Sequence, residues 1–169
     1  MFVLGIDPGL TRCGYACVES TGRGQARARA IGVIRTDPHD PLPARLAELH
    51  AELVALLAET QPAAVAVEQV FFQVNVRSAM GTAQASGLAM AAAHATGAEV
   101  IQYTPTQVKQ AVAGDGRADK EQVGRMVKTL LGLARVPEPA DAADAAALAL
   151  CHLAHSPLAR AATAGASRR

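Results

Sequence analysis

Aromatic side chains are scarce in this sequence. Its 169 residues include no Trp, three Phe and two Tyr. Half of the residues are nevertheless hydrophobic, which is enough to form a core. The scarcity of aromatic residues excludes a core built around large rings, so we expect one compact domain packed mainly by Ala, Val, Leu and Ile.

An excess of positive charge is also missing. Lys and Arg together number 16 against 15 Asp and Glu, which gives a formal net charge of +1. Only three of the basic residues are Lys. This balance excludes a generally basic nucleic-acid-binding protein, and any polyanion must therefore be bound by local patches.

Cysteine occurs only at Cys13, Cys17 and Cys151, an odd set without the spacing of metal ligands. We interpret them as reduced thiols, which predicts a cytoplasmic protein. The N-terminus has no basic segment and reaches Asp7 at once, so a signal peptide is not expected. The Ala- and Leu-rich stretches are interrupted by Gly, His or charge before they reach the length of a membrane span.

The hydrophobic pattern predicts one α/β domain over residues 1–155. Two hairpins followed by strand–helix–strand crossovers favour a mixed five-stranded sheet with helices on both faces. The tail, residues 156–169, is rich in Ala, Ser, Gly and Arg, and we expect it to be disordered. The expected strands are 2–7, 13–20, 26–36, 63–68 and 98–103, and the expected helices are 43–59, 77–96, one from Thr104-Pro105, one from Asp119 to Gly132, and 140–155.

Three apolar segments of the sequence carry a carboxylate at one end. Asp7 ends FVLGID, Glu68 ends AAVAVE, and Asp141 and Asp144 open DAADAAALALCH. Asp7 and Glu68 would lie at the carboxyl ends of neighbouring parallel strands, where open α/β sheets bind ligands. Two like charges at close range cost about 4 kcal/mol at an effective dielectric constant near 20. Divalent metal would relieve this repulsion, so the pattern predicts a two-metal nuclease site.

Each of these acids also has an ordinary structural alternative. Asp7 precedes Pro-Gly and suits a turn, and Glu68 could form a salt bridge with a basic residue. Asp141 and Asp144 share one helical face and complement the helix dipole in a first turn. The conjunction of all three segments, rather than any one of them, favours the metal site.

Phe71 and Phe72 follow Glu68 closely. Because adjacent strand residues face opposite ways, we expect one of them in the core and leave the other free to stack on a base. The sequence leaves open which ring faces DNA. Arg77, at the start of the next predicted helix, is a further expected DNA contact.

Basic residues gather around the Gly-rich loop AGDGRADK. Lys109, Arg117 and Lys120 are the expected phosphate contacts near the acids. The alternative is a solvated surface, which is the usual place for charged side chains.

Five segments occur in the order and at the intervals of a known family. They are GIDPG, VEQVFF, YTPTQVKQAVAGDGRADKEQV, MVKTLLGL and DAADAAALALCH, and over roughly residues 2–155 the chain resembles the RuvC family of Holliday-junction resolvases, the crossover junction endodeoxyribonucleases. The resemblance implies an RNase H-like fold and a homodimer. It also implies Mg²⁺-dependent cutting of four-way DNA junctions in recombination and in the repair of DNA damage. We expect two Mg²⁺ per site, with Mn²⁺ as a substitute.

The resemblance also assigns roles to single residues. Asp7, Glu68, Asp141 and Asp144 match the family's catalytic, metal-binding acids, although some members have His at the position of Asp141. Phe71 matches an aromatic residue that contacts junction bases, and Lys109 and Lys120 match basic residues near the DNA. The RuvA junction-binding protein and the RuvB motor are expected partners on this resemblance alone.

Two other classes of function stay open at this point. A strand, an Asp and a Gly turn also open actin-like ATPases and sugar kinases, but these need two such domains and this chain has room for one. A non-catalytic module could use the same fold to hold branched DNA, although four intact acids argue against it. A nuclease assay with Mg²⁺ separates all three.

Overall fold

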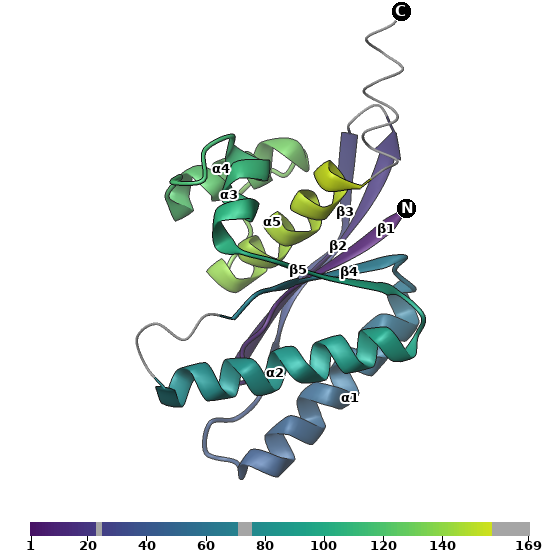
Figure 1. Ribbon diagram of the computed structural model, residues 1–169, viewed down its shortest axis with the longest axis vertical. Coiled ribbons are helices and arrows are strands. Elements are labelled where there is room, and N and C mark those ends of the chain that lie inside the picture. The colour runs from purple at the N-terminus through teal and green to yellow at the C-terminus, as the bar shows by residue number, and fades with distance from the viewer. Residues whose placement is uncertain (23–24, 71–75, 157–169) are drawn as a thin grey trace, which may run out of the picture.

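A computed structural model of the chain describes residues 1–22, 25–70 and 76–156. It shows one five-stranded sheet between two groups of helices (Figure 1). The strands are β1 (Phe2–Asp7), β2 (Arg12–Gly22), β3 (Gln25–Arg35), β4 (Ala64–Glu68) and β5 (Glu99–Tyr103). The helices are α1 (Leu42–Thr60), α2 (Val76–Ala95), α3 (Pro105–Ala113), α4 (Lys120–Leu130) and α5 (Ala140–His155).

The sheet has the order β3-β2-β1-β4-β5. β1, β2 and β3 form an antiparallel meander, whereas β4 pairs in parallel with β1 on one side and with β5 on the other. This is the mixed five-stranded sheet that the sequence predicts, and the expected limits of strands and helices lie within two residues of those observed. The continuous apolar run of β4 follows from its central place, because both of its faces are covered.

Helices cover both faces of the sheet, as expected. In Figure 1, α1 and α2 lie on one side and α3, α4 and α5 on the other. The first core contains Leu4 and Ile6 of β1 with Leu49, Leu53 and Leu57 of α1. The second core is filled largely by small residues of α5, since its Ala side chains are nearly all buried. A core almost without rings is thus achieved by close approach of the backbone.

Two glycines make this close approach possible. A Cβ on Gly5 of β1 would come 2.0 Å from the carbonyl oxygen of Ala145, and one on Gly14 of β2 would come 2.0 Å from the carbonyl oxygen of Asp141. No side chain fits in either space, so α5 lies directly on β1 and β2. Its N-terminal turn is thereby held over the end of β1.

Two of the three helix starts on this side are fixed by side-chain caps, whereas α5 follows Pro139 without one. Thr104 caps α3 and Asp119 caps α4, each with the reciprocal bond of a capping box, and both starts were expected from the sequence. Ser156, the first residue of the expected tail, is buried, and its N–H donates to the His152 carbonyl at the end of α5. Residues 157–169 lie outside the described part, so the expected disorder stays a prediction. None of the helices in the described ranges combines the length and hydropathy that crossing a membrane requires.

Candidate active site

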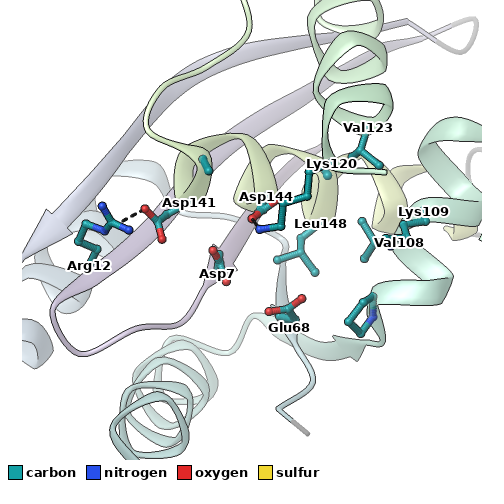
Figure 2. Close-up of a pocket in the computed structure, with 13 residues that line it drawn as sticks. Asp7, Arg12, Glu68, Val108, Lys109, Lys120, Val123, Asp141, Asp144 and Leu148 are labelled. Carbon is teal, nitrogen blue, oxygen red and sulfur yellow. Dashed lines mark hydrogen bonds and ion pairs between the residues drawn. The ribbon is translucent and has the colours of Figure 1, made fainter. Parts of the chain in front are cut away.

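The four acids singled out in the sequence line one pocket. It encloses about 280 Å³, and Figure 2 shows Asp7 between Glu68 and the two Asp residues of α5. Apolar side chains of α3, α4 and α5 line the side of the pocket away from Arg12. The other lining residues are Arg12, Pro105, Val108, Lys109, Lys120, Val123, Ala140, Ala147 and Leu148.

Strand register brings the first two acids together. Ile6 of β1 pairs with Val67 of β4 in a parallel ladder, so the next residue on each strand is a carboxylate at the same edge of the sheet. Asp141 and Asp144 come from the first turns of α5 and share one helical face. The expected convergence of strand ends and a helix start is therefore what the fold produces.

The acids strongly perturb one another. Burial, and after it the charges of Glu68, Asp144 and Asp141, raise the pKa of Asp7 from 3.8 to about 8, whereas Lys120 acts to lower it. Burial also raises the pKa of Glu68, as does Asp144, while a side-chain hydrogen bond with Asp7 opposes the shift. A site that disfavours its own negative charge to this extent is suited to a cation.

Two protein cations already meet the acids of α5. Lys120 Nζ lies 2.9 Å from Asp144 Oδ2, and this bond is the main cause of the raised pKa of Lys120. Arg12 Nε lies 3.2 Å from Asp141 Oδ2 (Figure 2). The second contact has the distance of an ion pair without the geometry of a hydrogen bond. Asp141 Oδ2 is shielded from solvent, and it has no hydrogen-bond partner.

The residues present fit a divalent cation by their chemistry. Four carboxylates offer the all-oxygen ligand set that Mg²⁺ prefers, and the buried Asp141 Oδ2 accepts no hydrogen bond, so its lone pairs are available to a metal ion. In the described ranges, no group of three or more His, Cys, Asp or Glu side chains is already arranged so that it could hold a metal ion. Two of the four acids are instead neutralised by Arg12 and Lys120.

The six expected DNA contacts are distributed unevenly. Lys109 and Lys120 both line the acid pocket, so Lys120 belongs to the acid site itself. Arg117 is 93% exposed and lies 3.6 Å from Asp115, away from the pocket lining. Phe71 and Phe72 lie outside the described residues. Arg77 is in the first turn of α2, and its side chain is likewise outside the described part.

Sequence reasoning missed Arg12 and the role of the two glycines in the sheet. Arg12 begins β2, immediately after the loop that follows Asp7. No feature of the sequence distinguishes it from the other arginines, because its partner Asp141 is distant along the chain. Gly5 and Gly14 stand inside strands, where glycine often marks a close backbone approach, and this was the available signal.

Comparison with known proteins agrees with this geometry. The family model for the crossover junction endodeoxyribonuclease RuvC matches residues 3–152. The RuvC of Salinispora arenicola is 56% identical over 153 residues, covering 90% of this chain and 87% of that protein. The RuvC of Frankia alni is 54% identical over 157 residues, covering 93% and 80%.

Solved structures give the same result. Thermus thermophilus RuvC superposes with a TM-score of 0.86 at 41% identity, covering 92% of this chain and 95% of that one. The T. thermophilus RuvC in complex with a Holliday junction substrate gives a TM-score of 0.85 at 42% identity, covering 90% and 92%. The fold is RNase H-like, as expected. The chain belongs to the RuvC family of crossover junction endodeoxyribonucleases.

Proposed function

We propose that this chain resolves four-way DNA junctions by paired, symmetric hydrolysis of phosphodiesters. The observation that carries the proposal is the single pocket that holds Asp7, Glu68, Asp141 and Asp144. Support comes from the match of nearly the whole chain to a RuvC that was solved with a Holliday junction substrate. Such cutting serves recombination and repair.

The acids would hold two Mg²⁺ ions, and Asp7 is the proposed principal ligand because it lies centrally among the other three (Figure 2). Glu68, Asp141 and Asp144 would complete the ligand sets. When bound, a metal pair supplies an activated water and stabilises the leaving oxygen. The chain itself supplies the ligand charges, the apolar wall that limits access of water, and Lys109 and Lys120 to orient phosphates.

Symmetric cutting requires two sites, which a twofold homodimer provides because each protomer brings one pocket. Helix α2, which is rich in small side chains, is the proposed interface between the two protomers. Its face with Met80, Gly87 and Ala91 is exposed, and the position of a Cβ on Gly87 is open. RuvA and RuvB are proposed partners on the family resemblance alone.

The described cysteines support a reducing compartment. Cys13, Cys17 and Cys151 are buried and free, and burial raises the pKa values of all three thiols, to about 12 for Cys13 and Cys151. Thiols of this kind are unreactive packing residues, which agrees with the proposed cytoplasmic location.

The test is cleavage of a synthetic four-way junction in Mg²⁺, compared with a linear duplex of the same sequence. Wild-type protein is expected to make paired cuts in the junction alone. Asp7→Asn, Glu68→Gln, Asp141→Asn and Asp144→Asn are each expected to abolish cutting, because each removes a charged ligand while keeping the shape.

Junction binding in EDTA should survive in all four variants and tighten in some, since negative charge is lost. Glu59→Gln on α1, an exposed carboxylate far from the pocket, is the matched control and should cut normally. Wild-type turnover in any one of the four variants would remove that residue from the site. Binding without cutting by the wild type would favour the non-catalytic alternative.

A further inference from the structure

The ion pair between Arg12 and Asp141 has the features of a contact that can break. The Arg12 side chain is 52% exposed, whereas that of Asp141 is 21% exposed and its Oδ2 is inaccessible to solvent. Asp141 is thus fixed, and the long, half-exposed arginine is free to reorient. Since the 3.2 Å contact lacks hydrogen-bond geometry, little holds the guanidinium there beyond charge.

Arg12 also stands among other arginines. Arg35 of β3 is its direct partner across the β2–β3 ladder, so the two side chains leave the same face of the sheet. Arg45 of α1 donates from Nη2 to Thr11 Oγ1 at 2.7 Å and from Nε to Thr36 Oγ1 at 3.0 Å. Cys13 and Ile34, which adjoin Arg12 and Arg35, pack in the core with α1, so Arg45 lies at the same end of the two strands but on the opposite face of the sheet. We call the facing pair Arg12 and Arg35 the arginine strip.

The arginine strip has an excess of positive charge. Within the described residues, Arg12 has an acidic partner and Arg35 has none. Like charges placed directly opposite on a sheet are unfavourable without a counter-ion, so the strip is suited to an anion from outside the chain. A DNA phosphate is such an anion, and arginine binds it through two parallel hydrogen bonds.

The same guanidinium and a divalent cation cannot share Asp141. In a partly buried pocket, their repulsion at contact distance is several times the thermal energy. A metal ion can therefore bind Asp141 only when the Arg12–Asp141 ion pair has broken. An incoming DNA phosphate offers Arg12 a new ion pair in its place.

We propose that Arg12 is an exchange residue, which neutralises Asp141 in the DNA-free protein and passes to a DNA phosphate when the junction binds. The exchange frees Asp141 for metal and so couples junction binding to metal binding, in both directions by linkage. It extends the proposed function and rests on it for the identity of the DNA. Arg12 is a positioning residue in this scheme, because it acts through Asp141 and the phosphate backbone.

The first test measures metal binding without DNA. The melting temperature is followed in a Mg²⁺ titration for the wild type, Arg12→Ala, Arg12→Lys and the control Arg27→Ala, an exposed arginine toward the other end of β3. Arg12→Ala is expected to reach half-maximal stabilisation at about two- to fivefold lower Mg²⁺, the size expected when an exposed ion pair no longer competes. Arg12→Lys and Arg27→Ala should stay near the wild type.

The second test measures junction binding in EDTA at several salt concentrations. Arg12→Ala is expected to bind more weakly and to lower the log–log salt slope by about 0.9, the value for one lost phosphate contact. Arg12→Lys should keep the slope because it keeps the charge. Arg12→Gln, which retains most of the side chain, replaces Arg12→Ala if the latter fails to fold.

An unchanged Mg²⁺ midpoint or an unchanged salt slope in Arg12→Ala overturns the exchange. Neither readout depends on cleavage. Failure of the wild type to cut junctions would therefore overturn the proposed function. The exchange of Arg12 would still be decided by the Mg²⁺ midpoint and the salt slope.

Discussion

Gly14 of β2 lies directly against Asp141 at the start of α5, so closely that a Cβ on Gly14 would come 2.0 Å from the Asp141 carbonyl oxygen and 3.2 Å from its Cα. Gly5 has the same relationship with Ala145 one turn further along α5. The distance between Asp141 and Asp7 therefore depends on the absence of two methyl groups from the sheet.

Gly14→Ala is expected to lose both stability and activity. The new methyl group meets backbone rather than a flexible side chain, so α5 must shift, at a cost of about 3 kcal/mol or more. For a chain of this size, that corresponds to a drop of roughly 6–12 °C in melting temperature. Junction cutting at saturating Mg²⁺ should fall even at temperatures where the variant is fully folded.

Gly81→Ala is the matched control for this substitution. Gly81 lies in α2, and a Cβ added to it would meet Leu10 Cβ as its nearest atom, at an ordinary 3.5 Å. Alanine there should be neutral or stabilising by up to about 1 kcal/mol, because it favours the helix. A Gly14→Ala variant as stable and active as Gly81→Ala would show that the contact between α5 and β2 does not set the site.

Because of Asp7, the free energy of unfolding of the metal-free protein should decrease as the pH rises. The Asp7 pKa of about 8 in the folded state exceeds the ordinary value of 3.8, so the folded state binds a proton that the unfolded state releases. This contribution is fully present below about pH 4 and is lost as the pH rises through about 8. Since one pKa unit corresponds to about 1.36 kcal/mol, the loss amounts to several kcal/mol.

Melting curves in EDTA across this pH range check the prediction. Asp7→Asn should melt at a higher temperature than the wild type near neutral pH and should show a shallower pH dependence. Some slope should remain, because the pKa of Glu68 is raised as well. Mg²⁺ should stabilise the wild type far more than Asp7→Asn. Equal melting temperatures for the two proteins in EDTA at neutral pH would contradict a buried, repelled Asp7.

Much of this site could be predicted from the sequence, for a local reason. Asp7 and Glu68 each interrupt an apolar run at its end, and strand ends meet at one edge of a parallel sheet, so their convergence needs no knowledge of distant contacts. Arg12 could not be assigned in this way, because its role depends on which helix covers β2. The same holds for Gly14, whose partner is a backbone atom that no sequence pattern identifies.

The two lysines of the pocket should differ in their effects. Lys109 lines the pocket wall, whereas Lys120 is bonded to Asp144. Lys109→Ala is expected to weaken junction binding, to lower the salt slope by about 0.9, and to leave the rate at saturating DNA nearly unchanged. Lys120→Ala should lower that rate by about a hundredfold as well, the size seen when a group aimed at developing charge is lost.

Single-turnover cleavage and salt-dependent binding separate the two effects. Lys128→Ala, an exposed lysine in the last turn of α4, is the control and should behave as the wild type in both. An unaltered slope in Lys109→Ala would make Lys109 an ordinary surface charge.

The exposed face of α2 is expected to form the twofold interface. Met80, Gly87 and Ala91 lie on it at helical spacing, and Gly87→Arg would place a charged side chain in its centre. Sedimentation should show a wild-type dimer at micromolar concentration and a Gly87→Arg monomer that no longer makes paired cuts. Ala58→Arg on the exposed surface of α1 should remain dimeric. A wild-type monomer with intact junction cutting would exclude this interface.

Phe71 is expected to stack on a base at the centre of the junction. It lies three residues beyond Glu68, and at the crossover point bases are weakly paired. Stacking is worth roughly 1–3 kcal/mol, so Phe71→Ala should slow cleavage of a fully paired junction by about tenfold to a hundredfold. A junction with mismatches at its crossover should lose less, because its bases are already free.

The alternative position for Phe71 is the hydrophobic core, and it makes different predictions. Loss of a core ring lowers the melting temperature by an amount corresponding to about 3–5 kcal/mol and slows both junctions equally. Phe72→Ala, measured beside Phe71→Ala on both substrates, is the matched comparison, because the sequence leaves open which of the two rings faces DNA. If Phe71→Ala slows cleavage of both junctions equally and destabilises the fold, while Phe72→Ala slows cleavage of the paired junction more, then Phe71 packs in the core and Phe72 contacts the base. Equal losses in both variants would leave neither ring at the DNA.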